Sequence, residues 1–186
     1  MPTEDRRVLK TRKLIDDTCW ALMQEKPFDE ITVRDIAQRA AINRATFYRY
    51  HTDKFDWLEG KIREMVREVA EKSGGLLTAS ATKADVAAFE AIFDHLDAHY
   101  AQYALLLRHK STGIVQDLLS EMHIQLKAQA GDQNLAPLEE MRFHYSMSAV
   151  VGAIEWWLRN DRPISSKDMA RELGQMHSGW HGDIQK

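Results

Sequence analysis

Cysteine is almost absent from this 186-residue sequence. Cys19 is the only one, so a single chain cannot form an internal disulfide, which excludes a small disulfide-stapled fold. No apolar run approaches the roughly 20 residues needed to span a bilayer. The first residues, MPTEDRRVLKTRK, lack the apolar segment of a secretory signal. We therefore expect a cytoplasmic protein without a membrane contact.

Signals for β-strands are also scarce, and only four prolines interrupt the chain. Apolar residues instead recur at helical spacing almost throughout, as with Ile15 and Cys19, which are four residues apart. The fold class predicted is all-α, with about nine helices. Small and polar residues at 73–82 indicate a boundary between a domain at 1–72 and a second domain at 83–186.

Charge is unevenly distributed along the chain. The net charge of -3 argues against a protein that coats nucleic acid with its whole surface. Residues 1–54 contain 11 Lys/Arg and 9 Asp/Glu, so they carry +2, and the rest of the chain carries -5. A small basic module on an acidic body is typical of a local contact with DNA.

Two short helices joined by a tight turn are predicted within the basic module. Thr32, with Asp35 three residues later, is close to a capping box and predicts a helix at 33–40. Asn43 is a good N-cap and predicts a second short helix at 44–50. Longer helices on either side would brace the pair. This is the layout of a helix-turn-helix.

The second short helix has side chains that can recognise bases. It reads Arg-Ala-Thr-Phe-Tyr-Arg-Tyr from Arg44 to Tyr50. Arginine forks onto a guanine edge, whereas alanine and the threonine methyl contact a thymine methyl. Tyrosine hydroxyls and lysine ammoniums bind phosphates, and Lys54 opens the next helix, whose N-terminal amides also favour a phosphate. The pattern predicts that this helix contacts DNA.

The run from Phe28 to Lys54 resembles the signature of the tetracycline-repressor (TetR) family, approximately T-V-x-x-I-A-x-x-A-G-V-S-x-x-T-[FL]-Y-x-H-F-x-x-K. The matching residues are Thr32, Val33, Ile36, Ala37, Ala40, Thr46, Phe47, Tyr48 and Lys54. The resemblance covers about residues 12–60 and implies that the chain binds double-stranded operator DNA. It assigns the DNA contacts to Thr32, Arg44, Ala45, Thr46, Tyr48 and Lys54.

Three positions depart from the family pattern. Ala41 stands where the turn usually has glycine, which costs about 1 kcal/mol if the residue has a positive φ. Pro27 replaces another common glycine. The aromatic pair is exchanged, with Tyr50 at the usual histidine position and His51 at the usual phenylalanine position. We expect His51 to be half-buried, and its contact with DNA stays open.

The basic residues before the helix-turn-helix have two interpretations. They are Arg6, Arg7, Lys10, Arg12 and Lys13. They form either an arm that reaches DNA or a solvated start of the chain, and the sequence leaves both open.

No catalytic or metal site is predicted. His95 and His99 have the i, i+4 spacing that suits a metal, but no third ligand follows at motif spacing. Cys19 lies on an apolar helix face and is expected to be a core residue rather than a nucleophile. No Ser/His/Asp arrangement, paired-carboxylate motif or phosphate-cradling glycine loop is evident. We expect no enzyme and no cofactor.

The last two predicted helices suit self-association. A long helix at about 137–159 combines an apolar stripe with small residues, and a final helix from about 166 has a further apolar face. Two helices cannot bury both faces alone, but the four-helix bundle of a homodimer can. Residues 149–158 and 165–170 resemble the last two helices of one TetR subgroup, which implies the same. The predicted dimer residues are Val151, Ile154, Met169, Leu173, Met176 and Trp180.

A ligand cavity is expected among the helices of residues 84–158, as the TetR resemblance implies. The predicted lining is aromatic and methionine-rich with few charges, so we expect an apolar or aromatic small-molecule effector. The lining residues are Phe89, Phe93, Tyr100, Tyr103, Met122, Met147 and Trp156.

The sequence thus predicts a transcriptional regulator. Regulators of this type are most often repressors that a small molecule releases from a palindromic operator. One alternative is a coactivator whose C-terminal domain binds a partner protein. Another is a helical enzyme or carrier with an incidental helix-turn-helix. The operator, the regulated genes, the ligand and the sign of regulation stay open.

Overall fold

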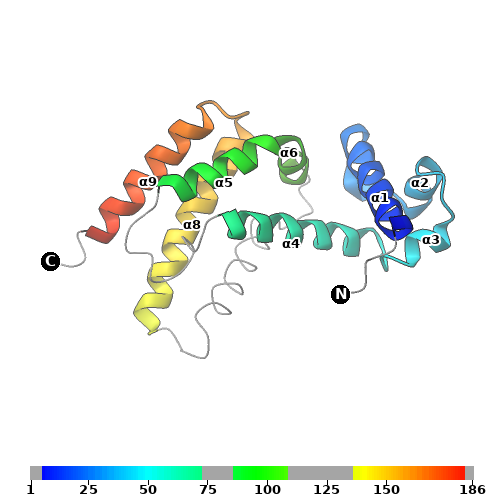
Figure 1. Cartoon of the computed structure of the whole chain (residues 1–186), viewed down its shortest axis with the longest axis horizontal. Coiled ribbons are helices and arrows are strands. Elements are labelled where there is room, and N and C mark those ends of the chain that lie inside the picture. The colour runs from blue at the N-terminus through cyan, green and yellow to red at the C-terminus, as the bar shows by residue number, and fades with distance from the viewer. Residues whose placement is uncertain (1–5, 73–85, 109–135, 183–186) are drawn as a thin grey trace. The chain divides into compact units, whose positions relative to one another are not determined.

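The structure is a computed structural model that describes residues 6–72, 86–108 and 136–182. These ranges form eight α-helices and one 3-10 helix, without a β-strand, so the all-α prediction is confirmed (Figure 1). The chain divides into two compact units, one of residues 1–61 that also includes Arg108, and one that begins at Ile62 and contains the rest of the described residues. We call them the N-terminal unit and the C-terminal unit. The boundary predicted at 73–82 lies outside the described residues.

The N-terminal unit contains α1 (Arg6–Glu25), the 3-10 helix η1 (Phe28–Glu30), α2 (Val33–Arg39), α3 (Arg44–Tyr48) and the start of α4 (Lys54–Lys72). Its core consists of apolar side chains from every one of these elements. The core residues are Ile15, Cys19, Leu22, Met23, Phe28, Ile31, Ile36, Ala37, Ala40, Phe47, Trp57 and Leu58.

Local signals set the ends of the short helices. The Oγ1 of Thr32 accepts from the backbone N–H of Asp35, and the Asp35 carboxylate accepts from the backbone N–H of Thr32. The predicted capping box is therefore present. Between α2 and α3, Ala41 has φ 51°, where the TetR pattern usually has glycine. This left-handed conformation costs alanine about 1 kcal/mol relative to glycine.

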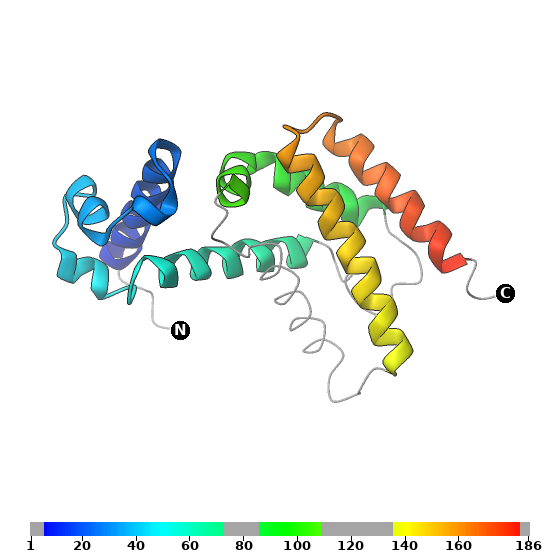
Figure 2. The same cartoon turned by 180° about the vertical axis from the view of Figure 1, so that it is seen from behind.

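The C-terminal unit contains the rest of α4, together with α5 (Val86–Ala98), α6 (Tyr100–Arg108) apart from its last residue, α8 (Pro137–Arg159) and α9 (Ser166–Gly182). After α8 the chain turns at residues 160–165, and α9 returns to pack against α5 (Figure 2). A Cβ added to Gly174 of α9 would lie 2.9 Å from a methyl of Val86, so glycine permits this close approach.

An aromatic pair holds α5 to α8 in the C-terminal unit. The rings of Phe93 and Trp157 meet edge to face, with centroids 5.2 Å apart, and both side chains are fully buried. The indole N–H of Trp157 donates to the backbone carbonyl of Ile164 at 2.8 Å. The same indole therefore fixes the turn that leads into α9. Asp161 and Arg162 in that turn both have positive φ.

Candidate nucleic-acid interface

Helix α3 has an exposed outer face, and one buried side chain on its inner face fastens it to the core. The Oδ1 of Asn43 caps the helix by accepting from the backbone N–H of Ala45 at 2.9 Å. Phe47 is fully buried and fastens the helix to the core. Arg44 and Ala45 are exposed, and so is Tyr48 at 54%. The cap and the anchor thus hold the helix while leaving its outer face open to a large partner.

The start of α2 brings a second predicted contact residue to the surface. Thr32 is exposed, and its hydroxyl oxygen already accepts from the backbone of Asp35. The Asp35 carboxylate also binds the ammonium of Lys26 at 2.8 Å. These hydrogen bonds, that from Lys26 first, lower the pKa of Asp35 to about 2. The cap therefore keeps its charge at any physiological pH, while the Thr32 hydroxyl proton can still be donated outward.

Lys54 has a different environment from the one its sequence position suggests. Its ammonium donates to the backbone carbonyls of Phe28, Asp29 and Ile31 at 2.8 to 2.9 Å. It also lies over the rings of Phe28 and Phe55, about 5 Å from each centroid. Burial lowers its pKa. Three carbonyls occupy all three ammonium protons, so Lys54 fastens η1 to the first turn of α4.

The exchanged aromatic pair occupies the end of the helix-turn-helix. His51 is half-buried, as expected, with its ring 5.4 Å from that of Phe47 and its Nδ1 3.8 Å from the Asp56 carboxylate. Burial lowers the pKa of His51. Tyr50 lies below the guanidinium of Arg12, which is 5.7 Å from its ring centroid. That contact places α1 beside the end of α3.

A carboxylate on α1 holds the start of α4. The Oδ1 of Asp16 accepts from the indole N–H of Trp57 at 2.8 Å, and its Oδ2 pairs with Lys61 at 2.6 Å. Cys19, one turn along α1, is buried, and burial raises the pKa of its thiol to about 12. A thiol that stays protonated is a poor nucleophile, which agrees with a core role.

The predicted ligand residues fall into three groups by exposure. Phe89, Phe93 and Met147 are buried, Tyr100 and Tyr103 are half-buried, and Trp156 is 50% exposed. The core position next to Phe93 belongs to Trp157 rather than to Trp156. Met122 lies outside the described residues.

A polar cluster missed by sequence reasoning surrounds Tyr103. Its hydroxyl donates to the backbone carbonyl of Met65 in α4 at 3.4 Å. The same oxygen lies 3.2 Å from the Nε2 of His95, which is 3.5 Å from a Glu68 carboxylate oxygen. Burial raises the pKa of Tyr103 and lowers that of His95. The His95 and His99 rings are 4.4 Å apart. Within the described ranges, no group of three or more His, Cys, Asp or Glu side chains is placed to hold a metal.

The residues predicted to form a dimer interface differ in their availability. Val151, Ile154 and Met169 are buried in the protomer's own core, which leaves almost none of their area for a partner. Leu173 is half-buried, Met176 is 66% exposed, and nothing is described of the Trp180 side chain.

A different set of apolar residues, none of them among the predicted dimer residues, is exposed along α8. Its residues recur at intervals of three or four and form what we call the α8 stripe, Leu138, Met141, Tyr145, Ala149, Gly152 and Trp156. Ala149 and Gly152 are among the small residues that the sequence places along this helix. No helix in the described ranges is long and apolar enough to cross a membrane.

Two family models match the chain. Residues 15–58 match "Bacterial regulatory proteins, tetR family", and residues 87–179, half of the chain, match "Transcriptional regulator C-terminal region". The first match contains the whole of α2 and α3, and the second contains all of α6 and α8. The matches therefore cover both the candidate DNA-binding face and the α8 stripe.

A curated relative, the HTH-type transcriptional regulator YxbF of Bacillus subtilis, is 20% identical over 191 residues. That match covers 88% of this chain, and the chain spans only 44% of the relative's length. Its printed description is of a regulator, and the family models likewise describe regulators rather than enzymes.

Two solved structures share the fold. A TetR regulator from Streptococcus agalactiae has a TM-score of 0.65 and 19% identity, covering 92% of this chain and 96% of its own. The dihydroxyacetone kinase operon activator DhaS has a TM-score of 0.58 and 18% identity, covering 89% and 93%. With a family model over half its length, this chain belongs to the tetR family of bacterial regulatory proteins.

Proposed function

We propose that this chain acts as a homodimer that binds a near-palindromic operator through two copies of α3, and that a small apolar ligand releases it. The observation that carries the DNA part is the construction of α3. Its inner side chain, Phe47, is fully buried, while Arg44 and Tyr48 extend from the opposite face. A helix held in this way can insert into the major groove without unfolding.

Each side chain of the face has a proposed role. Arg44 reads a base, because a guanidinium at the start of a recognition helix can donate two hydrogen bonds to one guanine. Ala45 and the Thr46 methyl contact a thymine methyl, and Tyr48 and Thr32 donate to phosphates. Lys54, with its three carbonyl partners, supports this face by fixing the first turn of α4 rather than by adding a free charge.

The occupant that we propose for the α8 stripe is a second copy of the chain. Its large side chains are about half exposed, which is unfavourable in a protomer that stays alone. Nothing lies within 4 Å of the Cβ position of Gly152, and Ala149 is exposed nearby, so a partner helix can approach closely there. A twofold-related α8 with α9 completes a four-helix bundle.

The effector part of the proposal rests on the composition of the C-terminal unit. Phe89, Phe93 and Met147 provide an apolar interior, and the half-buried Tyr103 adds a hydroxyl that can orient a ligand. This mixture suits a small apolar or aromatic molecule. We propose that such a ligand, bound among the seven residues predicted from the sequence, lowers the affinity for DNA and so relieves repression.

One finding favours the second candidate. A solved structure that shares the fold is named an operon activator. By this alternative the chain activates transcription, and its C-terminal unit binds a partner protein instead of a small molecule. A transcription assay with the purified chain separates the two, because a repressor lowers and an activator raises the transcript level.

The experiment that tests DNA reading is a titration of the chain against the DNA upstream of its own gene and against a scrambled duplex. We expect Arg44→Ala to weaken specific binding by roughly 1–3 kcal/mol per half-site and to relax preference at one symmetric pair of positions. The matched control is Arg63→Ala, an exposed arginine on α4 in the C-terminal unit. Equal binding of both duplexes by the wild-type chain would contradict the proposal.

A further inference from the structure

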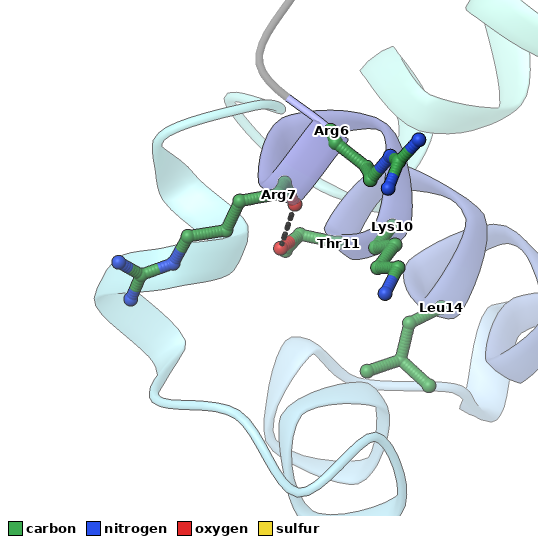
Figure 3. Close-up of a pocket in the computed structure, with 5 residues that line it drawn as sticks. All are labelled: Arg6, Arg7, Lys10, Thr11 and Leu14. Atoms are coloured by element: carbon green, nitrogen blue, oxygen red, sulfur yellow. Dashed lines mark hydrogen bonds between the residues drawn. The ribbon is translucent and has the colours of Figure 1, made fainter.

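We propose that the first two turns of α1 form a second contact with DNA, in which Arg6 and Lys10 each bind a backbone phosphate outside the base pairs that α3 reads. This inference rests on the proposed function, since it adds a backbone contact to the same complex. Arg6, Arg7, Lys10, Thr11 and Leu14 line an open groove of about 360 Å³ (Figure 3). That volume admits a phosphate group, and three of the five lining side chains are cations.

The arginines in the first turn of α1 interact unfavourably with the dipole of the helix that carries them. The N-terminal end of a helix is the positive end of its dipole, so acidic residues are favourable there and basic residues are unfavourable. The first turn of α1 contains no acidic residue and has Arg6 and Arg7 instead. The buried residues of α1 begin only at Ile15, and Arg6 and Lys10 are exposed, so these two side chains lie outside the core. Binding to a negatively charged partner explains why basic residues stand at these positions.

Several other cations of the N-terminal unit form ion pairs within the unit. Four of them lie 2.6 to 2.9 Å from a carboxylate oxygen, in the pairs Lys13–Asp17, Lys26–Asp35, Arg39–Glu25 and Lys61–Asp16. Arg6 and Lys10 are exposed, and neither forms an ion pair with another residue that the structure describes. Their charge is therefore available to an anion from outside.

The helix that carries the groove, α1, contacts the segment that directly follows the recognition helix. Arg12, two residues after Lys10 and on another side of the helix, has its guanidinium 5.7 Å from the ring centroid of Tyr50, two residues after α3 ends. The hydroxyl of Thr11 donates to the backbone carbonyl of Arg7 at 2.9 Å, which joins two of the lining residues within α1 (Figure 3). A duplex bound by α3 thus has its flanking backbone within reach of α1.

The test is the salt dependence of DNA binding by the full chain carrying Arg6→Gln and Lys10→Gln. The probes are the DNA upstream of its own gene and a mixed-sequence duplex of the same length. If each cation binds a phosphate, the slope of log K against log salt falls by about 1.8 per protomer on both probes. At about 0.1 M salt this is a loss of roughly 60-fold, and the ratio between the probes stays unchanged.

The matched control carries Arg67→Gln and Arg171→Gln, which remove two charges from exposed ion pairs in the C-terminal unit. It should retain the wild-type slope.

A slope that is unchanged in the α1 variant, or lowered as much in the control, overturns the inference while leaving the proposed function intact. Loss on the upstream probe alone also overturns it, because the residues would then read bases. A wild-type chain that binds neither probe overturns both proposals. The melting temperature of the α1 variant should not fall, since its helix loses unfavourable charges.

Discussion

In the N-terminal unit, polar side chains join one element to another, whereas the C-terminal unit carries a long apolar stripe on its described surface. Lys54 joins η1 to α4, and Asp16 joins α1 to α4. In the C-terminal unit, α8 instead exposes Met141, Tyr145 and Trp156 by half or more of their area. The N-terminal unit thus uses polar side chains to hold its elements together, whereas the C-terminal unit leaves apolar area exposed along α8.

Helix length explains this difference. α2 has seven residues and α3 has five, and helices this short are unstable without tertiary contacts. They require caps and clamps at both ends, which consume polar side chains. α8 has 23 residues and α9 has 17, so they can keep their conformation while one face stays free for assembly. The comparison predicts that single substitutions will unfold the first unit and disassemble the second.

The largest effect is expected from Phe47→Ala in the N-terminal unit. Phe47 is fully buried and is the only buried residue of α3, so its truncation leaves a cavity and frees the helix. We expect a loss of about 3–5 kcal/mol in the free energy of unfolding, measured by urea titration. Tyr48→Ala, on the exposed side of the same helix, is the control and should cost far less. Equal losses would show that α3 is not anchored by Phe47.

The next effect concerns assembly of the C-terminal unit. Ala149→Asp places a charge in the centre of the α8 stripe, where a dimer would bury it without a partner at a cost of several kcal/mol. Analytical ultracentrifugation should then find a monomer with its helix content intact. Ala101→Asp on α6, another exposed alanine in a helix, introduces the same charge away from the stripe. A dimer that survives the first substitution would remove α8 from the interface.

Lys54→Met tests whether Lys54 holds the N-terminal unit together or contacts DNA. The substitution keeps the apolar stem and removes the ammonium, so three backbone carbonyls lose their donor. We expect about 1–3 kcal/mol less stability, because the part-buried carbonyl of Ile31 loses its donor, while that of Phe28 still accepts from the backbone N–H of Ile31. The salt slope of DNA binding should stay unchanged. A slope that falls by about 0.9 per protomer instead would indicate the phosphate contact that the TetR resemblance implies.

The helix-turn-helix could be predicted from the sequence because its signals are local. Thr32 and Asp35 are three residues apart and cap each other, and Asn43 caps the helix that follows it directly. The partners of Lys54 are 23 to 26 residues away in η1. Nothing in the sequence around Lys54 indicates that the chain returns there, so only the structure identifies the clamp.

The exposed apolar face of α8 was harder to predict because apolar residues occur on more than one side of the helix. Val150, Val151 and Ile154 suggest one buried face, and Ala149 and Gly152 suggest another. Packing against α5 decides between them, since Phe93 meets Trp157 and so turns Trp156 outward. A single sequence indicates that α8 has two apolar faces. It does not indicate which face the protomer itself covers.

The smallest expected effect is a dependence of C-terminal unit stability on pH, which His95 should produce. Desolvation first, then the nearby His99, lowers its folded pKa below 6.5, and Glu68 opposes this. Between that lowered value and about 6.5 the unfolded chain binds a proton that the folded chain does not, so stability falls on acidification. The stabilisation is complete above pH 6.5 and is lost as pH falls through the folded pKa, with a slope of at most about 1.4 kcal/mol per pH unit.

Urea titrations from pH 7.5 to 5.0 should show a weaker dependence of stability on pH for His95→Gln than for the wild-type chain. The comparison is His51→Gln, which removes the histidine of the N-terminal unit whose pKa is lowered by burial. If only His51→Gln weakens the dependence, the acid-sensitive polar contacts belong to the DNA-binding unit alone.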